Sequence, residues 1–440
     1  MPTARVSQTP VTVAYSGGAV GARVSQVPIT LVYVDPAPVR ASQTPITTVY
    51  PLRPLPLRML IPSRPLVEIW QWKTSIFKSL YGDEQRMALR SEPFLQIQAS
   101  VPLKNNEDRI AIRYAFHRFA DERVNYPLFQ YSTPLTATTS IGGSTLTFDP
   151  EDTNVRDNEP IAIFNSDLSV YYVVETGAVS GTGIALASQA ENEYASGLYV
   201  APAPAARFNP GGTMAMRNND GTATVNFSVV PPRALLRPDA SETVSTYDSL
   251  PIIPDLYRTE TPVPEQFMFN LNTLDTMLQD PNDEKTWLDP QLITARKYRV
   301  LREDMDKWRA FGGTIKGGQK AFLLPSYRSD FTLSETPALG SNKLTTEDTY
   351  IEDYLRYEAN QYLLIDTANG SEYHKVIDTR LNHDRTLDIF LQDNLGASAG
   401  DNEISKIGLM HKVRLNGDTF TFTHHINHID LDFGASGVNF

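Results

Sequence analysis

Short segments in which apolar and polar residues alternate run along most of this chain. Between residues 94 and 100, Leu95, Ile97 and Ala99 alternate with two glutamines and a serine. This spacing predicts a strand with one face on a core and the other face in water. Similar short segments, separated by turn residues, fill 145–230 and 361–433. The pattern therefore predicts a mainly β protein with a few helices.

Two segments break the alternation and show helical spacing instead. The first lies around Ile110–Phe119. The second carries apolar residues three or four positions apart, and Gly312 can end it in the left-handed conformation. Its apolar residues are Tyr298, Leu301, Met305, Trp308 and Phe311.

The order of these segments occurs twice along the chain. Each half has a strand, a helix, an extended proline-containing segment and a series of short strands, and prolines cluster between the halves at 231–264. The strand before the helix is predicted at 94–100 in the first half and within 265–274 in the second, where Phe267, Phe269 and Leu271 alternate. We therefore expect two tandem, related β-barrel or β-sandwich domains, at 66–250 and 251–440. Two unrelated β-rich domains remain the alternative, because residue identity between the halves is low.

An eleven-residue phrase occurs three times before the first domain, at 5–15, 23–33 and 40–50. Each copy places a proline before alternating apolar residues that end in a tyrosine, which is typical of a short strand that begins at an edge. Strands this short need partners. We interpret 1–65 as an extended arm that pairs with neighbouring subunits, and a flexible proline-rich tail is the alternative. The predicted interface residues are Tyr15, Tyr33, Tyr50, Pro10, Pro28 and Pro45.

Composition narrows the possible functions. The 440 residues are more than one hydrophobic core normally serves. The formal net charge is −12 without any cluster of lysine and arginine, which argues against readout of nucleic acid. Because the chain has no cysteine, it has no disulfides, thiolate metal sites or cysteine nucleophiles. No signal peptide and no membrane span is expected from the sequence.

Candidate reactive groups do not form a catalytic pattern. His424, His425 and His428 raise the question of a metal site, but a strand would put His424 and His428 on one face and His425 on the other. We expect an aromatic and polar strand face at an interface, and metal binding is the alternative. The carboxylate pairs are expected on solvated faces, and "GGTIKGGQK" at 312–320 lacks a phosphate-loop ending. The pairs are Asp304 with Asp306 and Glu347 with Asp348.

We therefore expect no enzyme activity, no cofactor and no bound metal. A further charged group, formed by Glu84, Arg86 and Arg90, is interpreted as a structural ion network. A ligand clamp is the alternative for this group.

Several segments resemble structural proteins from the tail tip of tailed bacteriophages. "WQWKTSIFKSLYGDEQRMALRSEP" at 70–93, above all Gly82–Arg90, is similar to the opening of these proteins. "KWRAFGGTIKGGQKAFLLPSYRSDF" at 307–331 resembles a segment in which a helix ends in a compact loop and an aromatic strand. The resemblance implies a virion component of the tail tip, baseplate ring or hub, with other phage tail proteins as partners.

The resemblance also implies a ring. Tail tubes of such viruses are sixfold, and a chain with two related domains meets a sixfold partner as a trimer, whereas a hexamer presents twelve domains. A trimer is the slightly favoured expectation. A receptor- or carbohydrate-binding virion protein and a glycan-cleaving enzyme are the alternative functions.

Overall fold

The computed structural model describes residues 3–4, 33–34 and most of 62–438. Within 62–438, the residues outside the description are 79–83, 91, 119–122, 150–154, 210–212, 218–219, 230–242, 255–256, 259–264, 269–270, 275–281, 286–290, 339, 348, 356–360, 368–369, 397–403 and 426–427. Contacts divide the chain into two units, Met1–Pro51 and Leu52–Phe440. The expected separation of 66–250 from 251–440 therefore stays a prediction.

The first unit contains one described pairing, between β1 (Thr3–Ala4) and β2 (Tyr33–Val34). Tyr33, one of the predicted interface residues, lies in β2. The other predicted interface residues lie outside the described part of the chain, namely Tyr15, Tyr50, Pro10, Pro28 and Pro45. The repeat arm thus stays a prediction.

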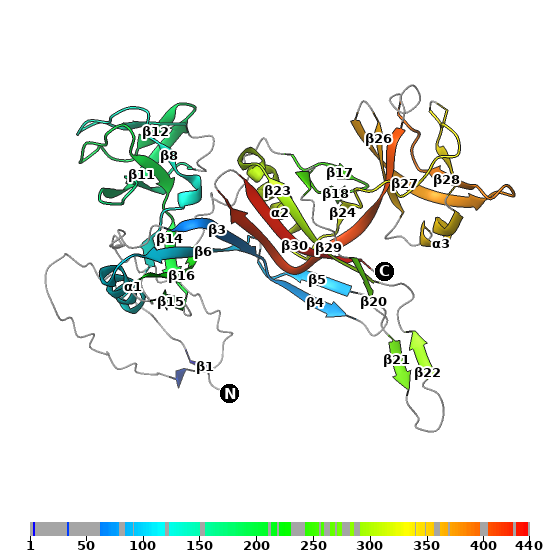
Figure 1. The fold of residues 1–440 in the computed structure, drawn as a ribbon, viewed down its shortest axis with the longest axis horizontal. Coiled ribbons are helices and arrows are strands. Elements are labelled where there is room, and N and C mark those ends of the chain that lie inside the picture. Colours follow the sequence, from blue (N-terminus) through cyan, green and yellow to red (C-terminus); the bar gives the residue numbers. More distant parts are fainter. Residues whose placement is uncertain are drawn as a thin grey trace. The chain divides into compact units, whose positions relative to one another are not determined.

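The second unit is mainly β, as the alternating pattern predicts, and its largest sheet is curled (Figure 1). A first group of strands in this sheet has the order β3-β6-β16-β14-β7, and β15 also pairs with β16. In β6 the residues Leu95, Ile97 and Ala99 are buried, so this strand is confirmed. The bounds are β3 (Ser63–Gln71), β6 (Phe94–Leu103), β7 (Arg123–Asn125), β14 (Ala205–Phe208), β15 (Thr213–Arg217) and β16 (Asp220–Val229).

A second group of strands continues the same sheet. Pairing gives the order β20-β23-β30-β29-β24, and β19 pairs with β23 beside β20. The groups meet where β3 pairs with the end of β29. The bounds are β19 (Tyr257–Arg258), β20 (Glu265–Met268), β23 (Gln291–Val300), β24 (Phe322–Pro325), β29 (Ile404–His424) and β30 (Ile429–Gly437).

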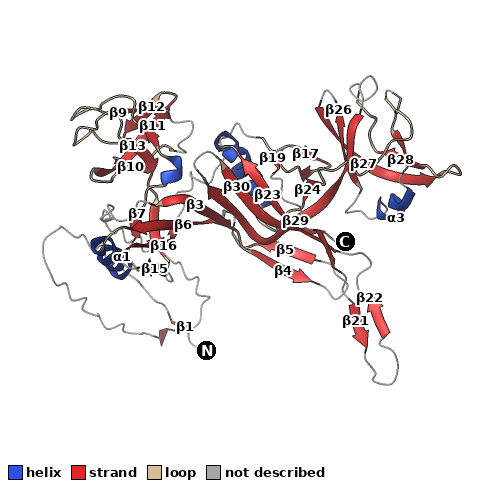
Figure 2. Cartoon of the chain, viewed as in Figure 1, coloured by secondary structure: helices blue, strands red, loops and turns tan. Residues whose placement is uncertain are grey.

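A two-stranded hairpin lies between the first two strands of each group along the chain. Between β3 and β6 it is β4 (Thr74–Lys78) with β5 (Glu84–Ala88), and between β20 and β23 it is β21 (Leu271–Leu274) with β22 (Asn282–Lys285). Both hairpins form separate sheets of their own (Figure 2). The strand expected within 265–274 is therefore divided between β20 and β21, and β23 is the strand that precedes the helix.

Two helices longer than one turn occur among the described residues, α1 (Asn106–Arg118) and α2 (Met305–Ile315). The first confirms the predicted helix. For α2 the predicted start is wrong, because residues 291–300 alternate in burial and pair along their length with β30. The predicted end is also wrong. Gly312 lies inside the helix, and Lys316 takes the left-handed conformation, with φ 51°.

Each helix leads, through a short strand, into further strands. The residues after α1 form a six-stranded sheet with its own core, of order β8-β13-β10-β11-β12-β9. The bounds are β8 (Thr133–Pro134), β9 (Thr145–Thr147), β10 (Pro160–Phe164), β11 (Tyr171–Ser180), β12 (Gly183–Leu186) and β13 (Tyr199–Pro202), with a 3-10 turn, η2 (Phe129–Tyr131), before them.

The residues after α2 extend the large sheet beyond β29, in the order β25-β28-β27-β26-β29. These strands also enclose a core cluster. The bounds are β25 (Lys343–Thr346), β26 (Tyr362–Thr367), β27 (Gly370–Leu381) and β28 (Leu387–Leu391), with the 3-10 turns η3 (Arg302–Asp304) and η4 (Thr349–Ile351), the one-turn helix α3 (Glu352–Leu355) and the small hairpin β17 (Thr246–Tyr247)–β18 (Leu250–Pro251).

The largest core cluster contains residues of both strand groups. Trp70 of β3 packs against Phe422 of β29, with ring centroids 4.9 Å apart. Trp72 packs edge-on against Phe420, which also contacts Trp308 of α2. The two groups therefore share one hydrophobic core. None of the helices in the described residues is long and apolar enough to cross a membrane.

Candidate functional site at the seam between the strand groups

The seam is the pairing of β3 with the last residues of β29. It is antiparallel and runs from Leu66 opposite His424 to Gln71 opposite Thr419. Strand alternation turns Leu66, Glu68 and Trp70 toward the interior, where all three are buried. One of these three inward positions is therefore occupied by a carboxylate.

Four side chains donate hydrogen bonds to the Glu68 carboxylate, which is only 2% exposed. Trp70 Nε1 lies at 2.6 Å, Tyr131 Oη at 2.7 Å and His424 Nε2 at 2.9 Å from its oxygens. Gln130 Nε2 lies at 3.3 Å. These four donors replace the water that the carboxylate loses on burial, which a buried charge requires.

The surroundings of Glu68 favour its charged form. Burial by itself raises the pKa of the carboxyl, but the hydrogen bond and charge of His424, the charge of Arg309 and the hydrogen bond from Tyr131 outweigh it. Together they lower the pKa of Glu68 from 4.5 to about 2. Burial, with a further contribution from the same carboxylate, raises the pKa of Tyr131 well above 10.

Arg309 of α2 brings a positive charge into the cluster. Its side chain is 2% exposed, and its guanidinium lies 5.1 Å from the centre of the Tyr131 ring and 6.0 Å from that of Trp70. Arg309 Nη1 also forms an ion pair with Asp306 Oδ1 at 2.7 Å. Asp306, expected on a solvated face, thus holds a buried arginine. We call Glu68, Tyr131, Arg309 and His424 the seam cluster.

The members of the seam cluster come from four elements far apart in the chain. They lie on β3, η2, α2 and β29. Removing one partner of such a buried charge network leaves the others uncompensated, which typically costs about 3–5 kcal/mol. The cluster therefore favours one register of β3 on β29 and one placement of α2 behind them.

Asp418 provides a second polar contact beside the seam. It takes a left-handed conformation, with φ 56°. Its carboxylate accepts hydrogen bonds from Thr74 N at 2.6 Å, Thr74 Oγ1 at 2.8 Å and Gly318 N at 2.5 Å. A Cβ on Gly317, where φ is +68°, would lie 2.6 Å from Trp72 Cβ. Residues 316–320 therefore form the turn that ends α2 and pack closely against the seam, whereas 312–315 still belong to the helix.

The conspicuous Gly82–Arg90 segment contacts the same loop. Arg86 on β5 donates a hydrogen bond to the carbonyl oxygen of Gly318 at 3.0 Å. Arg90 lies over the Phe94 ring, 5.4 Å from its centre. The side chain of Glu84 is outside the described residues, so the expected ion network among the three is not tested.

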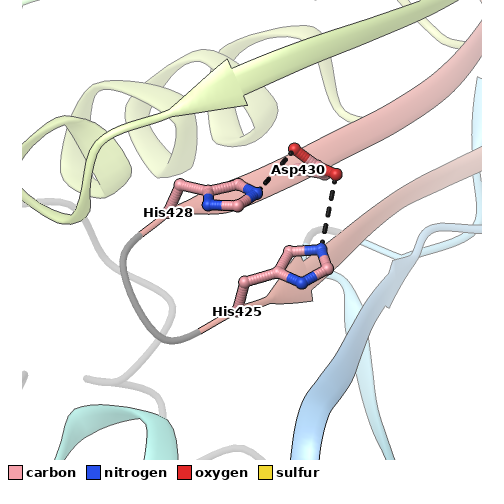
Figure 3. A group of neighbouring side chains, drawn as sticks. All are labelled: His425, His428 and Asp430. Carbon is pink, nitrogen blue, oxygen red and sulfur yellow. Dashed lines mark ion pairs between the residues drawn. The ribbon is translucent and has the colours of Figure 1, made fainter.

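The sequence pattern suggested one strand through His424, His425 and His428, but only His424 lies in a strand, at the end of β29. Strand β29 ends at His424 and β30 begins at Ile429, and the N–H of His425 donates to the carbonyl oxygen of His428 at 2.9 Å. His424 belongs to the seam cluster. His425 and His428 instead stack on each other, with ring centroids 4.5 Å apart, beside Asp430 (Figure 3).

Of the remaining carboxylates in the predicted pairs, Asp304 has an ion-pair partner. Asp304 forms an ion pair with Lys307 at 2.7 Å, and Glu347 is exposed. Asp348 lies outside the described residues. Sequence reasoning missed Glu68, whose partner His424 is 356 positions away. The available signal was a charged residue at an inward position of an alternating strand.

Known proteins add no assignment to this geometry. No model of a protein family matches the chain, and no curated protein matches it.

Proposed function

We propose that this chain is a structural ring component of a bacteriophage tail tip, baseplate or hub, built from two related domains. The observation that carries the proposal is the matching order of the two strand groups. In the first group the order is β3-β6-β16-β14-β7, and in the second it is β20-β23-β30-β29-β24. The resemblance of 70–93 and 307–331 to tail-tip proteins supports the virion location.

The chain visits these strands in the same sequence in both groups. Each begins with an outer strand, forms a separate hairpin, continues into the inner strand, the helix and a short strand, and then enters further β structure. In each group the chain then forms a strand that pairs with the short strand, β14 with β7 and β29 with β24. The last strand of each group, β16 or β30, pairs with this strand and with the inner strand, β6 or β23. Chance agreement of eight consecutive features is a poor explanation, so we infer a duplication.

Register supports the same inference. Gln71 on β3 pairs with the first residue of β6, and Met268 on β20 pairs with the first residue of β23. Three residues before each of them lies a glutamate, Glu68 and Glu265. In the second group Glu265 contacts Arg296 at 3.5 Å.

The duplication predicts how copies of the chain associate. The seam joins the outer strand of the first group to the end of β29 in the second group. The corresponding edges are the outer edge of β19 and β20 and the outer edge of β15. Among the described strands, β20 pairs only with β23 and β15 only with β16. Edges of this kind favour pairing with another chain.

Pairing β20 of one copy with β15 of the next repeats the seam between chains. The interface is head-to-tail, and such interfaces close into rings when the rotation permits. Two related domains in each chain make a trimer of six near-equivalent domains, which suits the sixfold symmetry implied by the resemblance. The N-terminal arm then extends to a neighbouring subunit or another tail protein.

Engineered disulfides test this arrangement, because the chain has no cysteine of its own. In the seam, Ile69 lies opposite Thr421. The corresponding free-edge positions are Gln266, two residues before Met268 as Ile69 is before Gln71, and Thr213. Thr213 pairs with Thr224 of β16, and Thr224 pairs in turn with Ser100, the seventh residue of β6. In the second group Thr421 pairs with Asp432 of β30, which pairs with Lys297, the seventh residue of β23.

The test variant is Thr213→Cys with Gln266→Cys, and the matched control is Ile69→Cys with Thr421→Cys. We expect the test variant to form covalent species of two and three chains under oxidation, and the control to close a disulfide within one chain. Either single variant of the test pair should stay monomeric on a non-reducing gel. A control that closes while the test pair stays reduced at high protein concentration would contradict the ring.

A further inference from the structure

We propose that His425, His428 and Asp430 bind a divalent transition-metal ion, with Zn²⁺ as the best match. Their potential ligand atoms all lie within 4.8 Å of one another. The site is independent of the proposed ring. It uses the two histidines that the seam cluster leaves aside, and Figure 3 shows both imidazoles directed at the one carboxylate.

The distances fit metal ligands better than hydrogen bonds. His425 Nε2 lies 3.4 Å from Asp430 Oδ2, and His428 Nε2 lies 3.6 Å from Asp430 Oδ1. Both are at or beyond the limit of a useful hydrogen bond. In a tetrahedral zinc site with bonds of roughly 2.0–2.1 Å, neighbouring ligand atoms are about 3.3–3.4 Å apart. The two observed separations, each to a different oxygen of the carboxylate, are close to that spacing, and all the potential ligand atoms lie within 4.8 Å of one another.

The carboxylate has an oxygen that needs a partner. Asp430 is only 8% exposed, and its Oδ1 is buried without a hydrogen bond. A buried charged oxygen of this kind requires compensation. Lys297 Nζ approaches the other oxygen, Oδ2, at 3.5 Å, and its side chain is 43% exposed. A metal ion between Asp430 and the imidazoles would compensate Oδ1 directly.

The imidazoles are held in place and are accessible. The N–H of His425 donates to the carbonyl oxygen of His428, and the two rings stack at an interplanar angle of 17°. Their side chains are 34% and 30% exposed, so a hydrated ion can reach them. Two imidazoles and one carboxylate match the ligand preference of zinc, and water can fill the fourth position.

The experiment uses the full chain without a histidine tag, treated with EDTA and dialysed. Isothermal titration with Zn²⁺ measures stoichiometry and affinity, and Co²⁺ absorption reports tetrahedral coordination. We expect one ion per chain. His425→Gln and His428→Gln should each weaken binding by about tenfold or more, because loss of even an outer-shell partner of a metal ligand typically costs about 10–100-fold.

His383→Gln is the matched control, because His383 is an exposed histidine in the turn after β27. It should bind zinc like the unchanged chain. Circular dichroism of each variant separates lost zinc binding from lost folding. Asp430→Asn should also weaken zinc binding and serves as a third variant. The proposal is overturned if the unchanged chain binds no stoichiometric zinc, or if folded His425→Gln and His428→Gln variants bind it as tightly as the control.

Discussion

Replacing Glu68 by glutamine should destabilise the protein in a pH-dependent way. The change keeps the size of the side chain but removes the charge that His424, Arg309 and Tyr131 surround. The pKa of Glu68 falls from 4.5 to about 2 on folding. A difference of about 2.5 units at 1.36 kcal/mol per unit corresponds to about 3 kcal/mol of stability at neutral pH. This agrees with the usual cost of breaking a buried charge pair.

The direction in which the stabilisation by Glu68 changes with pH follows from proton linkage. The unfolded chain binds a proton at Glu68 below pH 4.5, whereas the folded chain resists protonation down to about pH 2. The stabilisation is therefore complete above pH 4.5 and is lost as the pH falls through about 2. The free energy of unfolding of Glu68→Gln should lie about 3 kcal/mol below that of the unchanged chain at pH 7, and the gap should shrink below pH 4.5.

Urea unfolding followed by tryptophan fluorescence measures this gap, because Trp70 and Trp308 are buried in the shared core. The control is Glu303→Gln, an exposed glutamate just before α2, which should change stability by less than about 0.5 kcal/mol. A Glu68→Gln variant as stable as this control at pH 7 would refute the reasoning. So would a gap that stays constant down to pH 3.

Three further outcomes are expected. Burial lowers the pKa of His411 from 6.5 to about 4, so stability should fall as the pH drops from 6.5 through about 4, and His411→Gln should flatten that part of an acid titration followed by circular dichroism. Gly317→Ala should lower the free energy of unfolding in urea by about 1–3 kcal/mol more than Gly340→Ala, because both positions have positive φ but only the first would press a Cβ against Trp72; equal losses would contradict the packing. Deleting residues 1–60, which make up most of the 1–65 arm and stop short of β3, should leave the circular dichroism and melting of the remaining chain unchanged and weaken assembly in sedimentation velocity. Unchanged assembly would contradict the role of the arm.

The sequence predicts individual strands better than their connections. Leu95, Ile97 and Ala99 alternate without competition, so β6 could be recognised from its own residues. Tyr298 fits both a helical and an alternating spacing, and it lies in strand β23 because that segment pairs with β30. Local pattern cannot show that choice, because the partner strand is more than a hundred residues away.

The candidate site was predictable only in part. The histidines at 424–428 stand out in the sequence, but their division between the seam cluster and the Asp430 group depends on where β29 ends, at His424. Glu68 stays charged in the core because of His424 and Arg309, and no local sequence pattern connects these residues with it. Long-range pairing of β3 with β29 brings them together.

The central claim, a ring of chains that each carry two related domains, is tested most directly by native mass spectrometry of the full chain at high protein concentration. The account predicts a discrete assembly of three chains, held by the β15 and β20 edges. A discrete assembly of six chains would contradict the trimer. A single chain at every concentration would contradict the ring itself.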